Sequence, residues 1–134
     1  MNRIGLTLFL AGAFLTGTLQ AHHSTRGIYE NEPIKMTGTV KAWRLINPHP
    51  QMILEAKDEN GVLREWDVSW GGAAAVHLKR QGYTADTFKV GETITLEGNR
   101  ALADDVYGLL MEGGGHPTRE DGTPVVAGVS EESR

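Results

Sequence analysis

Histidine is the residue type in this sequence whose chemistry stands out, at positions His22, His23, His49, His77 and His116. Imidazole nitrogen is a common ligand of Zn(II) and Cu(II), and the chain has no cysteine to offer a thiolate. If the chain is cleaved after Ala21, His22 supplies an α-amine as well as an imidazole, next to the imidazole of His23. Cu(II) favours such nitrogen-rich ligand sets. Cleavage before Ala21 instead makes His23 the third residue of the processed chain. The terminal amine, two backbone amide nitrogens and the imidazole of His23 can then bind Cu(II) or Ni(II) together. The alternative is that both histidines hold only adventitious metal.

His49 lies between two prolines, in the segment Asn47-Pro48-His49-Pro50. Each proline fixes its own φ and restricts the residue before it to an extended conformation. The turn therefore presents one imidazole in a set direction, which a metal ligand requires. The sequence predicts a copper site, or a zinc site, built from His22, His23 and His49, with Tyr29 as a weaker candidate ligand. The alternative is a stiff loop in which His49 only hydrogen-bonds to backbone.

Other functions have less support from the residues present. His77 is expected in packing or at the surface of a helix, and His116 is expected to be solvated in a glycine loop. The chain contains no H-E-x-x-H zinc motif, C-x-x-C-H haem site or G-x-S-x-G nucleophile elbow, so a hydrolase or an oxidase has little support. The rival to metal binding is a module that binds a small organic ligand or a partner protein. Its surface would be one face of the domain, although core packing is the simpler role for Trp43, Trp66 and Trp70.

Residues 1–21 have the three parts of a cleavable secretory signal. Arg3 charges the start, residues 4–15 form a short apolar run, and Leu19-Gln20-Ala21 fits a signal-peptidase site. We therefore expect a periplasmic or secreted protein without an integral membrane segment after processing; the alternative is a retained anchor. Loss of Arg3 leaves 12 basic and 17 acidic residues, a formal charge of −5. This acidic balance argues against nucleic-acid binding, and the lack of cysteine excludes a disulfide framework.

The remaining chain alternates apolar and polar residues as strands do. The first alternating run, residues 35–42, changes parity afterwards, which predicts a bulge near residues 42–44. Residues 51–57 and 62–70 form two more strands, joined by a hairpin that ends in Asn60-Gly61. In the third strand, Trp66 and Val68 should be buried while Glu65 and Asp67 face solvent. Gly71-Gly72 breaks that strand, residues 73–81 predict a short helix that ends at Gly82, and residues 93–98 and 106–112 predict two final strands.

This order of elements is that of the oligonucleotide/oligosaccharide-binding (OB) barrel, whose helix lies between strands three and four. We therefore predict a mostly β, five-stranded OB-like barrel over residues 35–112, with an antiparallel sandwich of six or seven strands as the main rival. Residues 22–34 form an N-terminal segment. Residues 113–134 form a flexible C-terminal tail, in which residues 125–129 offer a short edge strand.

Several motifs together resemble a family of small exported bacterial proteins, the domain of unknown function numbered six-one-five-two. Its specific motifs are the A-H-H-S start and the N-P-H turn; the matching residues are Ala21-His22-His23-Ser24, Tyr29, Gly38-Thr39-Val40, Asn47-Pro48-His49, Lys57-Asp58-Glu59-Asn60-Gly61, Trp66, Gly71-Gly72 and Val90-Gly91-Glu92. The resemblance covers the processed chain to about Gly98 and implies a periplasmic or secreted β-barrel of no settled activity. The sequence departs from the family pattern after Gly98, and at His77, where a small residue is expected.

Overall fold

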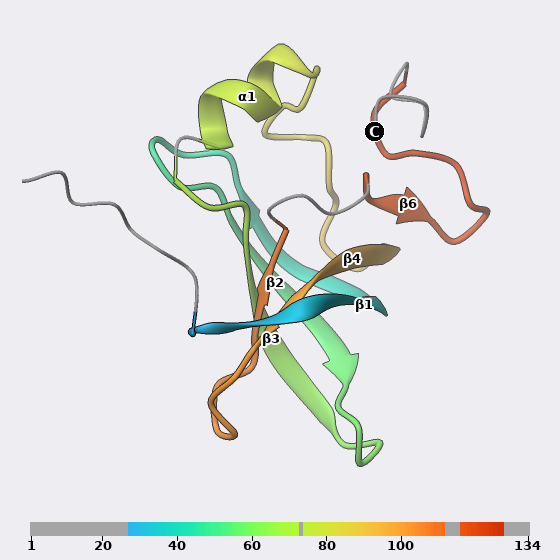
Figure 1. Cartoon of the computed structure of the whole chain (residues 1–134). Coiled ribbons are helices and arrows are strands. Elements are labelled where there is room, and N and C mark those ends of the chain that lie inside the picture. The colour runs from blue at the N-terminus through green and yellow to red at the C-terminus, as the bar shows by residue number, and fades with distance from the viewer. Residues whose placement is uncertain (1–26, 73, 112–115, 128–134) are drawn as a thin grey trace, which may run out of the picture.

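The elements follow one another in the predicted order: three strands, a helix and two strands. The structure is a computed structural model, and it describes residues 27–72, 74–111 and 116–127 (Figure 1). Its elements are β1 (Tyr29–Arg44), β2 (Gln51–Lys57), β3 (Leu63–Ser69), α1 (Ala74–Arg80), β4 (Thr93–Ala101), β5 (Gly108–Leu110) and β6 (Thr118–Arg119).

Strand pairing closes the sheet into a barrel. β1 pairs antiparallel with β2 in its second half and with β4 in its first half. β3 pairs antiparallel with β2 and parallel with β5, and β5 returns to β4, so the five strands form a closed ring. The predicted OB-like barrel is confirmed, and the antiparallel sandwich is wrong because β3 and β5 run parallel and complete the ring.

The core lies inside this ring, because every second side chain of each strand points inward. In β3, Trp66 and Val68 are 1% and 0% exposed, whereas Glu65 and Asp67 face solvent, so the predicted register is confirmed. The helix also buries the predicted face, made of Ala74, Ala75 and Leu78. The fold therefore rests on the alternation that the sequence shows.

β1 is a long strand that bends sharply, because its two halves belong to different strand pairs. It begins at Tyr29, six residues before the alternating run, since its first half is paired with β4 as far as Ala101. The bulge lies between Val40 and Ala42, slightly earlier than predicted. At Gly38, β1 crosses β2 so closely that an added Cβ would lie 2.5 Å from the carbonyl oxygen of Glu55. Only glycine fits this crossing without displacement.

The turns follow the predicted positions with one difference in mechanism. α1 ends at Arg80, Gly82 follows it with a φ of +94°, and the N–H of Tyr83 donates to the carbonyl of Leu78 at 2.9 Å, as in a Schellman C-cap. In the β2–β3 hairpin, only Gly61 takes a positive φ, of +76°. The rest of that turn is stabilised by Asp58, whose Oδ1 accepts hydrogen bonds from the backbone N–H groups of Asn60 and Val62.

The described part of the C-terminal region packs on the barrel. β6 pairs with β4, opposite Ile94 and Thr95, and Pro117 and Val125 are buried. The extra strand is thus Thr118–Arg119, ahead of the 125–129 segment for which it was expected, and residues 128 and 129 lie outside the described residues.

Candidate ligand-binding site

The Asn47–Pro50 turn holds the imidazole of His49 at the surface. Its Nδ1 lies 3.3 Å from the carbonyl oxygen of Gly71, and the ring is exposed. In the tautomer with the proton on Nδ1, this nitrogen donates to Gly71 and Nε2 is left as a base directed to solvent. The turn is tied to the helix as well, since the N–H of Ala75 donates to the carbonyl of Pro48 at 3.4 Å. His49 is therefore presented by a fixed loop beside α1.

The other predicted metal ligands do not join His49 within the part of the chain that is described. His22 and His23 lie outside the described residues, and those that are described contain no group of three His, Asp or Glu side chains able to hold a metal. Tyr29 stands at the start of β1, opposite Ala101 of β4. In Figure 1 this start of β1 lies apart from the β1–β2 turn, which adjoins α1. His77 is exposed on α1, and His116 is half-buried.

The three tryptophans contribute to the core. Trp43 packs edge-on against Trp70 and Phe88, with ring centroids 5.4 and 4.9 Å apart, and its Nε1 donates to the carbonyl of Thr84 at 2.9 Å. The buried Trp66 donates from Nε1 to the carbonyl of Ala56 at 3.2 Å. These contacts show that the tryptophan rings pack in or against the core, as the simpler expectation for Trp43, Trp66 and Trp70 holds.

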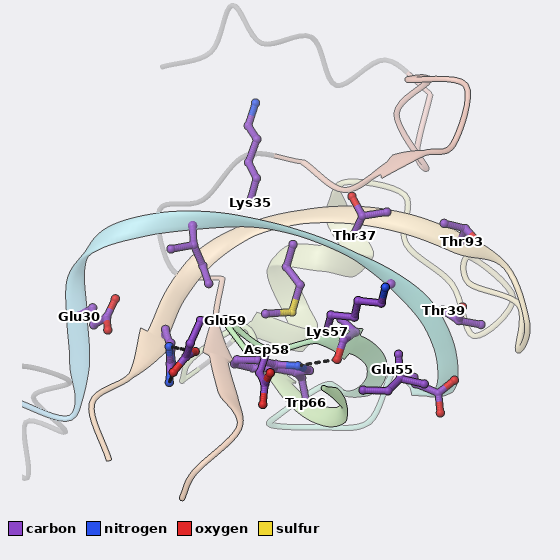
Figure 2. Close-up of a pocket in the computed structure, with 16 residues that line it drawn as sticks. Glu30, Lys35, Thr37, Thr39, Glu55, Lys57, Asp58, Glu59, Trp66 and Thr93 are labelled. Carbon is purple, nitrogen blue, oxygen red and sulfur yellow. Dashed lines mark hydrogen bonds and ion pairs between the residues drawn. The ribbon is translucent and has the colours of Figure 1, made fainter. Parts of the chain in front are cut away.

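A groove between β1 and β2 has a volume of about 570 Å³ (Figure 2). We call it the β1–β2 groove. Its lining comes mostly from the first half of β1 and from the β2–β3 hairpin: Glu30, Ile34, Lys35, Met36, Thr37, Gly38, Thr39, Glu55, Ala56, Lys57, Asp58, Glu59, Leu63, Trp66, Thr93 and Arg100.

The groove exists because two neighbouring strands diverge. The β1–β2 ladder runs from Arg44–Gln51 to Thr39–Glu55 and goes no further. Beyond Thr39, the first half of β1 continues alongside β4, whereas β2 continues alongside β3. The close contact of Gly38 with Glu55 marks the narrow end. Figure 2 shows β1 arching over the side chains of Lys57, Asp58 and Trp66.

An ion pair bounds the wide end of the groove. The Arg100 guanidinium donates to both carboxylate oxygens of Glu59, with Nη2 and Oε1 3.1 Å apart, and it lies 5.9 Å from the centre of the Trp66 ring. This hydrogen-bonded pair lowers the pKa of Glu59. The interaction connects β4 to the β2–β3 hairpin across the groove.

Most of the carboxylates that line the groove lie in ion pairs. Three of its carboxylates already face a cation, in the pairs Glu55–Lys41, Asp58–Arg64 and Glu59–Arg100. Hydrogen bonds from Val62 and Arg64 outweigh the opposing effect of burial and lower the pKa of Asp58. A general acid or base needs a carboxyl pKa raised toward neutrality.

Glu30 and Lys57 also line the groove, and neither forms an ion pair with any residue in the described ranges. Both charges are therefore open to a ligand. The sequence did not reveal this groove, because its position depends on the point at which two strands stop pairing. The only local signals are Pro33 and Gly38 within β1.

A second hollow of about 290 Å³ lies on the outer side of β1, β2 and β3, lined by Ala42, Arg44, Gln51, Ile53 and Asp67. It is about half the volume of the β1–β2 groove.

In the described residues, no helix is long and apolar enough to cross a membrane.

A model of a known protein family matches most of the chain. No curated protein and no solved structure matches the chain significantly. The model of a family of unknown function, DUF6152, matches residues 12–110 of the 134. The match extends past Gly98 to the end of β5, so the departure noted there does not end the resemblance. The barrel and its β1–β2 groove both fall inside the matched range, and the chain belongs to the family of unknown function DUF6152.

Proposed function

We propose that this protein is an exported, non-catalytic binding module whose ligand occupies the β1–β2 groove. The observation that carries the proposal is the groove itself: about 570 Å³ between two fixed strands. Ligand sites in proteins typically enclose about 300–1,000 Å³ and combine an apolar lining with a few polar groups. Ile34, Met36 and Leu63 supply the apolar lining, and Glu30 and Lys57 supply charge. Residues 1–21 support export by their composition.

The proposal is tested by blocking the groove and leaving the rest of the surface unchanged. Leu63 lines the groove with a side chain 56% exposed, so Leu63→Trp fills part of it without disturbing the core. Val62 is 45% exposed and does not line the groove, which makes Val62→Trp the matched control. The probe is a library of small aromatic, acidic and basic fragments, followed through the backbone amide signals of the labelled protein.

We expect bound fragments to shift the amide signals of residues 34–38 and 55–59. These shifts should be lost in Leu63→Trp and kept in Val62→Trp. Fragments that instead shift residues around Ile53 or His49, or that bind both variants equally, would exclude the groove as the binding site.

Copper binding through His22, His23 and His49 is a second candidate, and one observation favours it. The contact between His49 Nδ1 and Gly71 leaves Nε2 as a preoriented nitrogen at the surface. The two N-terminal histidines would add two imidazoles and an amine, enough for Cu(II) or Zn(II). In this proposal the metal connects the N-terminal segment to the barrel.

A copper titration followed by electron paramagnetic resonance tests this candidate in protein that begins at His22. His49→Ala should weaken binding at least tenfold, about 1.4 kcal/mol. His77→Ala and His116→Ala are the controls and should bind as the parent does. Equal affinity of His49→Ala and the parent would rule out a shared site.

A further inference from the structure

Inside the β1–β2 groove, the backbone of β1 has an edge that pairs with none of the strands in the described ranges. The N–H of Val40 donates to Glu92 and its carbonyl accepts from Gly91, at 2.9 and 2.8 Å, so the backbone groups of Val40 face the β4 side. Backbone groups of successive strand residues alternate between the two edges. The register with β4 is continuous from Pro33 to Thr39, so Lys35 and Thr37 direct their N–H and C=O groups the other way, into the groove.

Pro33 agrees with this assignment. It has the same parity as Lys35 and Thr37, and it has no N–H to donate. Proline is tolerated in a strand where its nitrogen faces an unpaired edge. Its position therefore fits an edge of β1 that pairs with no other strand of the barrel.

The β2 wall, which faces β1 across the groove, also has backbone groups without a partner in the β1–β2 ladder. The N–H of Asp58 donates to Val62 at 2.9 Å, so the backbone of Asp58 faces β3. By alternation, Lys57 directs its N–H and C=O groups toward β1. The pair Thr39–Glu55 ends the ladder, and Lys57 would be opposite Thr37 if the register continued. The strands have separated there, so these two residues belong to no pair of the β1–β2 ladder.

We propose that the β1–β2 groove binds an extended peptide of a partner protein, which adds as a strand along the free edge of β1. The inference rests on the proposed function and names its ligand class. The β1 wall offers the N–H and C=O groups of Lys35 and Thr37 and the β2 wall those of Lys57, and another peptide backbone is the ligand that complements them. From Ile34 to Thr37, short of the narrow end at Gly38, the wall spans three residue steps, about 10 Å at about 3.3 Å per residue. It accommodates roughly four residues of peptide.

The side chains around the groove define which peptide fits. Peptide residues that point inward meet Met36, which is part of the core, and Ile34, which packs against it, so they should be apolar. In Figure 2, Lys57 extends its ammonium group along the groove. Its charge has no ion-pair partner among the residues of the described ranges. We therefore expect an acidic residue at the outward position next to Lys57, within an alternating apolar and polar sequence.

The test uses a displayed library of random dodecapeptides, selected on the processed full-length protein. The best peptide is then synthesised and titrated against Thr37→Pro and Thr37→Ala. Thr37→Pro removes a groove-facing N–H that no strand uses, while Thr37→Ala keeps it. We expect at least tenfold weaker binding to Thr37→Pro and less than threefold change for Thr37→Ala.

Modified peptides keep the test valid even if Thr37→Pro folds poorly. Methylating the amide nitrogens of alternate peptide residues removes the donors on one edge only. Methylation of one set of alternate amides should weaken binding to the parent protein at least tenfold, because the donors in that set face β1. The other set should matter less, because β2 contacts the inserted strand through Lys57 alone. A ligand held by side chains only would show no such alternation.

The outcomes separate this inference from the proposed function. If no peptide is selected, or if both methylated sets bind as the parent peptide does, the peptide inference is wrong. Fragment binding that depends on Leu63 would then still support the groove as a site for another ligand. Peptides that bind Leu63→Trp as tightly as the parent contradict the peptide inference. A concentration-dependent dimer that Thr37→Pro abolishes would assign the groove to a second copy of this chain and also overturn the inference.

Discussion

Gly38→Ala tests whether the close crossing of β1 over β2 fixes the barrel. The added Cβ would meet the carbonyl oxygen of Glu55 at 2.5 Å and carbons of Ala56 and Leu54 at 2.9 Å. These distances are 0.5 to 0.9 Å shorter than 3.4 Å, where ordinary contact begins. One neighbour is backbone inside a strand ladder, so the clash cannot be relieved by rotating a side chain. Overpacking of this kind typically costs about 1–3 kcal/mol.

Gly72→Ala is the matched control. Gly72 has no atom within 4 Å of an added Cβ and has no positive φ. Alanine there should be neutral or stabilising by about 0.4–1 kcal/mol, since it restricts only the unfolded chain. The same entropic gain applies to Gly38→Ala and cancels in the comparison, so the two variants should differ in unfolding free energy by the overpacking cost, about 1–3 kcal/mol.

Guanidinium unfolding, followed by circular dichroism, measures both variants with the m-value as a check on two-state behaviour. A net loss of about 1–2 kcal/mol for Gly38→Ala corresponds to a melting point lowered by roughly 4–16 °C, at about 4–8 °C per kcal/mol. If Gly38→Ala and Gly72→Ala unfold together, the strands do not approach as described, and the account of the narrow end of the groove fails.

Four further results are expected. Trp66→Ala should lose about 3–5 kcal/mol of unfolding free energy in denaturant titration, because the ring is 1% exposed; a loss below 1 kcal/mol would contradict its burial. Burial raises the pKa of Tyr83 to about 12 from an unfolded value of about 10, so stability is complete below pH 10 and is lost as the pH rises through 12. Tyr83→Phe should reduce that alkaline loss in a pH series of melting curves; an unchanged loss would contradict the burial of the phenol. Pairing with Arg100 lowers the pKa of Glu59, so the stability that Glu59 adds is present above its usual range and lost as the pH falls; Glu59→Gln should therefore be less stable than the parent at pH 7 and equal to it in acid. N-terminal sequencing of the exported protein should begin at His22, and a start at Met1 or beyond Ser24 would exclude the proposed processing.

The fold was predictable because its signals are local. Alternation in the third strand gave the buried face of Trp66 and Val68, and Gly82 gave the end of the helix. The strand bounds were less accurate at β1, where pairing with distant β4 extends the strand past Pro33 to Tyr29. No local pattern in residues 29–34 reveals that pairing.

The candidate site was far less predictable than the fold. Histidines are conspicuous in a sequence because their chemistry is carried by the side chain. The β1–β2 groove depends instead on backbone groups of Lys35, Thr37 and Lys57, whose side-chain types say nothing about unpaired edges. Its position is set by the separation of two strands after Thr39–Glu55, which follows from the closure of the barrel.

The pairing of β1 with β4 also determines when this chain can fold. Its partners are 54 to 72 positions apart in the sequence, from Thr39 with Thr93 to Tyr29 with Ala101. Contacts between such distant segments slow folding, because the intervening chain must be ordered before they form. During synthesis, the first strand has no partner on one side until residues 93–101 have left the ribosome. The ring thus closes only after its last strand, β5, is available.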